Sequence, residues 1–572
     1  MRGNRRVPSV VALLAVALVT FTMAPVAASA ATVSTTAGLD VATAAAFTPP
    51  VANISNRPAM LLETDYYVYG PGTGFTVPEV TLSIDDFGYD QPATLYVYWQ
   101  NRVSGQTLYY NVGAGFGATE RDLFGASAGA PAKIFVPDLT DFRLWGPNSA
   151  FGAVPGDVPA GTGQYQFVVE VRDANGNGVV SRANAMYNVV DGVVSVNGNI
   201  AGGNWSAGNA YFLATPVYVT GGTLNVEPGT FVLGSQAGQG TLIVLPDGQL
   251  QAPGTAMRPI VFTSELTVGD RGPGDWGGLV LSGDAPVNGS PREGEGDSGQ
   301  FGGNDPAHNC GRLQYVRVEY AGIRFSEQNE LNGIALQGCG TQTVIDHVQV
   351  HYNQDDGIEF FGGTNDARYV AITYAEDDSL DWTFGWTGRL QHFVAIQGGG
   401  EADHGIEADN DGDNPDLAPR SNPTIYNATW IGPEGLPTQS GAPGFLLRRG
   451  TQVTIRNAIV QNFTGPNYDV DGAESQAFAG TSLTIGNSFF FSNNGAGNID
   501  LNTIGPANST ANPLLANPRG LTPDLSPRPG SPARNGGTVP PNDGFFDQVG
   551  YAGGVDPNNS WIWEGWLTFS DN

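Results

Sequence analysis

Three short stretches of the chain repeat one pattern of acidic, small and apolar residues. They read QDDGIE at 354–359, EDDSLD at 376–381 and ADHGIE at 402–407, with steps of 22 and 26 residues between them. Near-repeats at this spacing are typical of solenoids, in which each repeat forms one coil stacked on the coil before it. Equivalent positions on adjacent coils of a parallel sheet lie roughly 4.8 Å apart. The sequence therefore predicts columns of carboxylates along one side of a solenoid.

A second recurring position marks the strands of this solenoid. Pairs of mostly apolar residues, separated by one position, follow one another at steps of 32, 22, 24, 34, 30 and 30 residues. The pairs are Val316/Val318, Val348/Val350, Val370/Ile372, Val394/Ile396, Ala428/Trp430, Ala458/Val460 and Ser488/Phe490. Such alternation predicts strands with one buried face. The short steps suit a bare coil of three strands and the longer steps a coil with a loop, which favours a right-handed parallel β-helix over residues 191–505.

The flanking regions have different patterns. Residues 59–190 contain longer alternating strands at 81–84, 93–99 and 164–171, and an Asn-Gly turn follows at 175–176, so we expect an antiparallel, immunoglobulin-like β-sandwich. The predicted fold class is therefore all-β, with this sandwich preceding the β-helix. Residues 506–572 are rich in Pro, Asn and aromatic residues and predict a C-terminal cap over the last coil, because an open sheet edge would promote aggregation. A carbohydrate-stacking platform is the alternative for these aromatic residues.

The beginning of the chain predicts export. Arginines precede an apolar run at 10–19, and the small residues that end at Ala30 are typical of a cleavage site, so residues 1–30 are interpreted as a signal peptide. A linker is predicted at 31–58. No later apolar run approaches the roughly 18 residues of a membrane helix. We expect a secreted or cell-surface protein whose mature chain has no transmembrane segment.

The net charge limits the classes of binding partner, and the cysteine content predicts a disulfide. The formal net charge is −30 and Lys133 is the only lysine, which makes nucleic acid an unfavourable partner and a cation a favourable one. Cys310 and Cys339 are the only cysteines. An even number of cysteines in an exported chain predicts a disulfide, here between neighbouring coils, and two buried free thiols are the alternative.

Several motifs resemble a group of known proteins. They are VEPGT at 226–230, GDWGGLVL at 274–281, FGGND at 301–305, DGIEFFGGT at 356–364 and GIEADN at 405–410. These segments resemble secreted or surface-attached bacterial β-helix proteins of the pectin-lyase-like superfamily, most of which have no assigned function. The resemblance covers residues 190–572 and implies the fold more than an activity.

The acidic columns predict a metal site. Alternation directs Glu359, Asp381 and Glu407 outward from the β-helix. Closely spaced carboxylates repel one another, share protons or recruit a cation, and calcium takes six to eight oxygen ligands. The expected calcium ligands are Asp355, Glu359, Asp381, Asp403, Glu407, Asp409, Asp411 and Asp413. The alternative is a solvated acidic face in which Asp and Asn serve as turn residues.

Catalysis on a polysaccharide is a further possibility. Polygalacturonases share the β-helix fold and carry a lone Asp, an Asp-Asp pair and a Gly-His-Gly on successive coils, followed by a basic pair. Asp356, Asp377, Asp378 and His404 are similar to that order, and they are the candidate catalytic residues. Two carboxyl groups would act as general acid and general base. Asp403 stands where the pattern has Gly, and the downstream arginines 448 and 449 are adjacent, so the resemblance is incomplete.

The function predicted from these observations is non-catalytic. We expect an exported, calcium-stabilised β-helix protein of the cell surface or extracellular space that makes adhesive or glycan contacts, with a polysaccharide or cell-envelope glycan as partner. The alternative is a polysaccharide hydrolase or lyase that acts on an acidic glycan through the stacked carboxylates.

Overall fold

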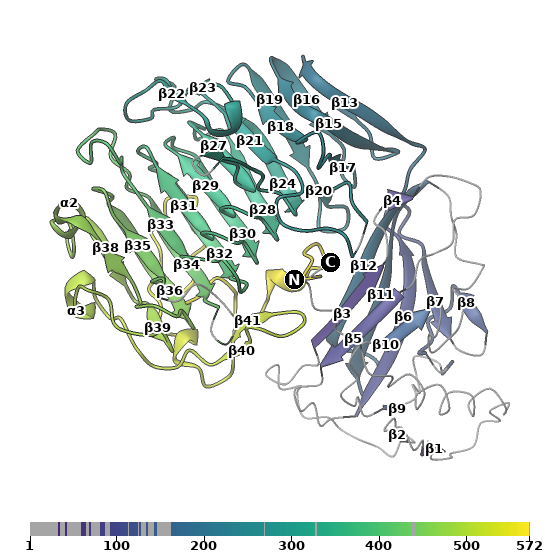
Figure 1. Ribbon diagram of the computed structural model, residues 1–572. Coiled ribbons are helices and arrows are strands. Elements are labelled where there is room, and N and C mark those ends of the chain that lie inside the picture. The colour runs from purple at the N-terminus through teal and green to yellow at the C-terminus, as the bar shows by residue number, and fades with distance from the viewer. Residues whose placement is uncertain are drawn as a thin grey trace. The chain divides into compact units, whose positions relative to one another are not determined.

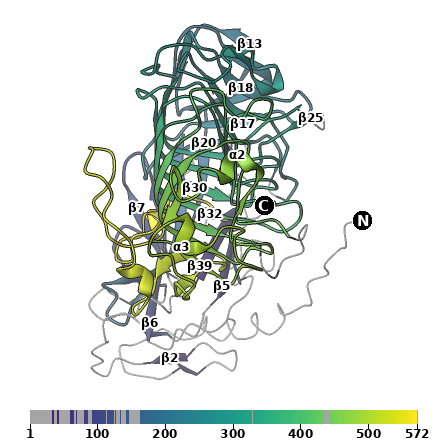
Figure 2. The ribbon, with the colours of Figure 1, turned by 90° about the vertical axis from the view of Figure 1, so that its left-hand side faces the viewer.

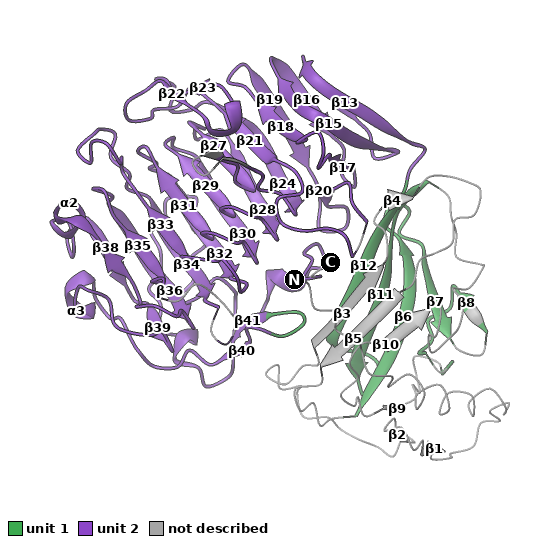
Figure 3. Cartoon of the chain, viewed as in Figure 1, with its two compact units in different colours: residues 1–189, 520–523 green, residues 190–519, 524–572 purple. Residues whose placement is uncertain are grey.

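The structure is a computed structural model whose chain forms two compact units (Figure 3). One unit comprises residues 1–189 and 520–523, and the other comprises 190–519 and 524–572. The structure describes strands β1–β5 and residues 92–570, except 112–113, 124, 127–132, 135–141, 146–161, 268, 327–328, 434 and 436–440. The predicted signal peptide lies outside the described residues, as does the predicted linker apart from β1 (Val33–Ser34) and β2 (Asp40–Ala42).

The first unit contains antiparallel strands, as the alternating pattern predicted. Its larger sheet is built around β6 (Ala93–Asn101), β11 (Gly163–Asp173) and β12 (Val179–Val189). Also in this sheet are β1, β2, β4 (Val68–Tyr69), β7 (Thr107–Asn111), β8 (Gly115–Gly117) and β9 (Lys133–Ile134). A second sheet contains β3 (Ala59–Thr64), β5 (Val80–Asp85) and β10 (Phe142–Trp145). Trp99 stacks on Tyr165 and donates to the hydroxyl of Tyr187, which anchors the buried side of the larger sheet. The immunoglobulin-like class of this unit stays a prediction.

The second unit is a parallel β-helix, in which 23 strands follow one another in one hydrogen-bonded array (Figure 1). The array bends at the corners of each coil and so forms three faces, and Figure 2 shows the stack from β13 at one end to β39 at the other. Eight long strands bend at a corner, so that the first half of each strand lies on one face and the second half lies on the next face. They are β13 (Gly192–Ile200), β15 (Asn209–Val219), β24 (Gly311–Glu319), β28 (Val344–His351), β30 (Asp366–Thr373), β32 (Arg389–Ile396), β34 (Thr424–Ile431) and β36 (Val453–Gln461).

The remaining strands of the array are short and complete the three faces. Face 1 contains β14 (Gly203–Trp205), β16 (Gly222–Val226), β19 (Gly248–Pro253), the first halves of β24–β36 and β38 (Leu483–Gly486). Face 2 contains β17 (Phe231–Gly234), β20 (Ile260–Ser264), the second halves of β24–β36 and β39 (Phe489–Phe491). Face 3 contains β18 (Thr241–Val244), β21 (Gly278–Ser282), β27 (Ile334–Gln337), β29 (Ile358–Phe361), β31 (Leu380–Thr383), β33 (Ile406–Ala408), β35 (Phe445–Leu447) and β37 (Asp469–Val470).

The corner between faces 1 and 2 has the same backbone conformation on seven successive coils. One residue of each coil adopts a positive φ of 47° to 59°, in order Tyr315, His347, Tyr369, His392, Asn427, Asn457 and Asn487. The first four rings stack, with centroids 4.3, 4.3 and 4.7 Å apart. We call these four residues the aromatic ladder. Ring stacking along the column compensates for a backbone conformation that residues with side chains seldom adopt.

The interior is one continuous apolar core that runs through all coils, and it corrects one predicted strand register. In β32 the interior residues are Phe393 and Ala395, which pair with Val370 and Ile372 of β30. The predicted interior pair Val394/Ile396 instead belongs to a second cluster on the outside of face 2. This strand is apolar on both sides because its outer side is also covered, so alternation alone cannot assign the buried side.

The C-terminal segment lies along the side of the β-helix rather than over its last coil, contrary to the prediction for its aromatic residues. Residues 537–570, which we call the strap, contact face 2 and its corners from Asn457 back to Tyr320. Trp561 and Trp566 pack against His347 of the aromatic ladder. The last coil is covered by residues around α2 (Gly472–Gln476) and α3 (Leu501–Ile504), whose apolar side chains complete the interior core.

Smaller elements and one covalent bond complete the described unit. They are β22 (Arg292–Glu293), η3 (Glu295–Asp297), β23 (Gln300–Phe301), β25 (Arg324–Ser326), β26 (Asn329–Glu330), β40 (Leu515–Asn517), β41 (Asp524–Pro527), η4 (Pro532–Arg534) and η5 (Trp561–Trp563). The predicted disulfide between Cys310 and Cys339 is confirmed, with Cα atoms 5.7 Å apart. Among the described residues, none of the helices has the length and apolarity that a membrane crossing requires.

Candidate metal and glycan site

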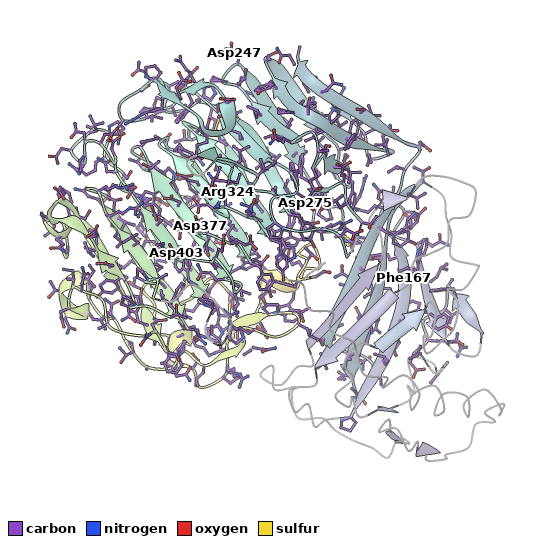
Figure 4. All side chains as sticks on the ribbon, viewed as in Figure 1. Phe167, Asp247, Asp275, Arg324, Asp377 and Asp403 are labelled. Atoms are coloured by element: carbon purple, nitrogen blue, oxygen red, sulfur yellow. A yellow bond between two sulfur atoms is a disulfide. The ribbon has the colours of Figure 1, made fainter. Side chains whose placement is uncertain are left out.

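The repeated sequence motifs form an acidic stack on face 3. Glu359 of β29 pairs in register with Asp381 of β31, which in turn pairs with Glu407 of β33. Ile358 and Leu380, beside them in sequence, lie in the interior core. The predicted outward column is therefore present, one carboxylate on each of three neighbouring coils. Figure 4 labels Asp377 and Asp403, two further acids, which lie in the turns that precede β31 and β33.

The turns that precede these strands hold two more columns. Asp378 donates its backbone N–H to Asp356 Oδ1 over 3.0 Å, and His404 donates its own to Asp378 Oδ1 over 2.6 Å. The Nδ1 atom of His404 also lies 2.9 Å from Asp378 Oδ1. A Cβ on Gly357 would lie 2.3 Å from Ile372, so glycine lets the chain pass close to the core at this point. These contacts give Asp356 and Asp378 a structural role in the turns.

The acids of the turns and of the acidic stack are shielded from water to different extents, and Asp381 and Glu407 are half-buried. Asp356, Asp378 and Glu359 are 7%, 3% and 6% exposed. Burial, and then the neighbouring carboxylates Glu295 and Asp355, raise the pKa of Glu359 well above its usual range. Burial and the Asp403 carboxylate raise the pKa of Asp377 to about 6. Folding therefore brings together carboxyl groups whose negative charges are either removed by protonation or balanced by cations.

Four overlapping sets of ligand atoms lie within reach of one ion. They are Asp355–Asp356–Asp377, Asp356–Glu359–Asp381, Asp378–Asp381–Glu407 and Asp378–Asp403–His404, and within each set the atoms lie within 4.8 Å of one another. Asp381 belongs to two of the sets, and its Oδ1 atom is buried without a hydrogen-bond partner among the described residues. Nearly all the donors are carboxylate oxygens, the type that calcium prefers. The residues fit a hard divalent cation.

Three further residues near the site, Asn332, Glu295 and Glu330, were not predicted. The side-chain amide of Asn332 donates to Glu359 Oε2 over 2.7 Å and contacts Glu295 Oε2 at 3.5 Å. Glu295 lies in the long loop between β21 and β24, and burial with the charge of Glu330 raises its pKa to about 7. Asn332 is equivalent to Asp356 on the next coil, as the hydrogen bond from Gly333 N–H to Asp356 O shows. This place in the coil repeat is the signal that could have identified Asn332.

Two acids of the downstream loop, Asp409 and Asp411, have arginine partners. Asp409 accepts hydrogen bonds from Arg448 at 2.9 Å and from Arg449 at 2.5 Å, and Arg448 also pairs with Glu407. Asp411 pairs with Arg292, and its Oδ1 atom accepts from the backbone N–H of Asp413 at 3.0 Å. Arginines thus neutralise Asp409 and Asp411, whereas the described residues around Asp356, Glu359 and Asp381 provide no such pair.

The candidate catalytic residues Asp356, Asp377, Asp378 and His404 lie on neighbouring turns, and their catalytic role stays a prediction. Asp378 accepts contacts from both the backbone and the ring of His404 and is nearly buried. Asp377 and Asp403 are the more accessible acids of the turns, and the Asp403 side chain is 45% exposed. A substrate would therefore meet Asp377 and Asp403 before Asp356 and Asp378.

Comparison with known proteins supports the fold-level interpretation. No curated protein matches the chain. Residues 201–511, which include every coil that carries the acidic stack, match the pectate-lyase-like β-helix domain. The match spans more than half of the chain, and the chain therefore belongs to the family of pectate-lyase-like β-helix domains.

Proposed function

We propose that the acidic stack binds divalent cations, calcium foremost, and that the protein uses them outside the cell to contact an acidic polysaccharide without cleaving it. The observation that carries the proposal is the register of Glu359, Asp381 and Glu407 on adjacent coils, with Asp355 and Asp377 beside them. Stacked carboxylates at strand spacing repel one another unless a cation lies between them.

A cation bound at this face has coordination positions left for a ligand. Calcium takes six to eight oxygens, and each set brings together three ligand atoms, one from each residue. Uronate carboxylates and hydroxyls would supply the others, so the ion would bridge two surfaces that are both negative. Membership of a polysaccharide-related family and the predicted export signal support a glycan as that second surface.

Calcium titration calorimetry on the full chain tests the cation. We expect binding with micromolar to submillimolar affinity, and an affinity at least tenfold lower in Asp381→Asn, because Asp381 is shared by two ligand sets. Asp247→Asn is the matched control, since Asp247 is an exposed carboxylate in the turn between β18 and β19 (Figure 4). Absence of calcium binding to the unmodified chain would refute the proposal.

Glycan contact is tested on immobilised polygalacturonate. We expect retention in millimolar calcium, release by a chelator, and no retention on the fully methyl-esterified polymer, which lacks the carboxylates. If calcium binds but the polymer does not retain the protein, the role of the ion is structural and the proposed glycan contact is refuted.

Hydrolysis is the second candidate, and the contact between Asp378 and His404 favours it. An inverting hydrolase needs a general acid with a raised pKa, and burial together with Asp403 gives Asp377 that property. Reducing-sugar release from polygalacturonate that is lost in Asp377→Asn and retained in Asp247→Asn would establish this activity. No release over a day at micromolar protein would exclude it for this polymer.

A further inference from the structure

Beneath the strap, face 2 carries a row of polar side chains that is unusual for a buried surface. Arg317, Glu319, Gln349, His351 and Thr373 alternate with core residues on three neighbouring coils, and each is at most 3% exposed. We call these five residues the floor. Further along the same face, apolar residues such as Val394, Ile396 and Ile431 predominate at the equivalent positions, together with the polar Thr429 and Gln461.

The floor binds the strap through main-chain atoms. Gln349 donates to Thr568 O over 2.6 Å and accepts from the N–H of Thr568 over 2.9 Å. Arg317 donates to Trp566 O over 3.3 Å, and His351 Nε2 lies 2.7 Å from Ser570 O. These contacts use the main-chain donors and acceptors of the strap and none of its side chains. Another linear polymer with hydroxyl groups at suitable spacing could therefore form the same hydrogen bonds with the floor.

The strap leaves one charged group of the floor unsatisfied. Both carboxylate oxygens of Glu319 are buried and have no hydrogen-bond partner among the described residues, and its remaining contact is an ion pair with Arg317 at 2.8 Å that lacks hydrogen-bond geometry. A buried carboxylate without hydrogen bonds is costly. The strap is therefore an imperfect occupant, because it offers no hydroxyl to Glu319.

Aromatic side chains border the floor on both sides. On one side lies the aromatic ladder, and on the other Tyr320, Tyr352 and Tyr374 follow one another with centroids 6.0 and 4.9 Å apart. The apolar C–H faces of sugar rings pack on such rings, while hydroxyls bond to polar groups between them. The charges of Arg317 and Glu319 cancel, and burial lowers the pKa of His351 to about 4, so the floor has no net charge at neutral pH.

From this arrangement we infer that the floor is a binding site for a neutral, hydroxyl-rich polysaccharide chain, and that residues 561–570 of the strap mask it. Neighbouring coils repeat the floor at about 4.8 Å, which suits a linear polymer of repeating units. The site is separate from the acidic stack, because it lies on face 2 rather than face 3 and needs no cation.

Competition in the unmodified protein is the first test. Thr568 N–H, which is protected by Gln349, should exchange with solvent at least tenfold faster when millimolar cellohexaose or mannohexaose displaces the end of the strap. Oligogalacturonate of the same length should leave the exchange unchanged. No acceleration by any neutral hexaose would overturn the inference, and acceleration by oligogalacturonate alone would overturn its neutral specificity.

Variants give the second test. Trp566→Ala should loosen the strap over the floor and raise the affinity for the neutral hexaose at least tenfold, and adding Arg317→Ala should remove that gain. Phe545→Ala is the matched control, because Phe545 lies in the strap over Arg368 and Arg389, away from the floor. If Trp566→Ala does not fold, Thr568→Pro removes the N–H that donates to Gln349, together with the hydroxyl that accepts from the N–H of Ser570. A folded, loosened variant without gain in affinity contradicts the inference.

Discussion

The aromatic ladder and the acidic stack are built alike, one side chain per coil, yet neighbours attract in one and repel in the other. Along the ladder, Tyr315, His347 and Tyr369 stack with centroids 4.3 Å apart. Along the stack, burial and then the neighbouring Glu359 carboxylate raise the pKa of Asp381 well above its usual range. A β-helix repeats the interaction that one position makes on every coil, so stacked rings add attraction along the ladder and stacked carboxylates add repulsion along the acidic stack.

The two columns also differ in the partners that the rest of the chain supplies. The ladder is completed from within the chain, since Tyr369 donates to Asp547 of the strap over 2.8 Å and His392 Nε2 lies 3.1 Å from the same carboxylate. These contacts lower the pKa of Asp547 to about 2, His392 being the largest cause. In the acidic stack, Glu359 accepts a neutral hydrogen bond from Asn332 and Glu407 pairs with Arg448, but no arginine among the described residues forms an ion pair with Glu359 or Asp381. We therefore expect the ladder to be insensitive to calcium and the stack to depend on it.

Calcium should produce the largest effect. A ligand at 1,000 times its dissociation constant stabilises the native state by about 4 kcal/mol, so millimolar calcium should raise the melting temperature of the full chain by several degrees relative to chelator. The shift should be smaller in Asp381→Asn, by about 1.4 kcal/mol of stabilisation for each tenfold loss of affinity, and should persist in Tyr369→Ala. Thermal unfolding followed by circular dichroism measures it, and equal shifts in all three proteins would contradict a site at the stack.

Removing a ring from the ladder should have the next largest effect. Tyr369→Ala deletes a side chain stacked on both sides and should lower the free energy of unfolding by about 3 kcal/mol, with or without calcium. Tyr369→Phe keeps the stacking and loses the hydrogen bond to Asp547, which should cost about 1 kcal/mol. Chemical denaturation checks both values. A loss in Tyr369→Phe as large as in Tyr369→Ala would show that the strap contact, not stacking, stabilises the ladder.

The metal-free protein should lose stability as pH rises from 4 to 7. A carboxyl group whose pKa is higher in the folded than in the unfolded chain binds its proton more tightly when folded, so its contribution is favourable at low pH and declines as pH passes the folded pKa. Those values are about 6 for Asp377 and about 7 for Glu295. Denaturation midpoints measured between pH 4 and 8 should fall in chelator and stay level in calcium. A midpoint that rises over this range in chelator would be inconsistent with protonated acids in the stack.

The sequence predicted those features that repetition encodes. The register of Glu359 with Asp381 follows from alternation around Ile358 and Leu380, and the disulfide follows from the count of cysteines. Local periodicity is the signal in the first case, because each coil repeats the same environment. The family match over residues 201–511 rests on the same repeated strands and turns.

Contacts made by non-repeating segments could not be predicted from the sequence. Glu295 reaches Asn332 from a long loop, and the strap covers coils more than 200 residues earlier in the chain, so neither has a periodic signature. The strap also explains the register error in β32, since it makes Val394 as buried as Phe393. Likewise, Asp409 and Asp411 have the spacing of calcium ligands, but the arginines that hold them come from distant segments.

Asp409→Asn should have the smallest effect and gives the sharpest control on the extent of the site. Its carboxylate already has Arg448 and Arg449 as partners, so the substitution removes two partly exposed ion pairs and should cost about 1 kcal/mol. Because these arginines compensate the charge of Asp409, its loss should leave the calcium-dependent shift in melting temperature unchanged. If the shift instead falls as far as in Asp381→Asn, the arginines must release Asp409 when calcium binds, and the metal site extends one turn beyond the stack.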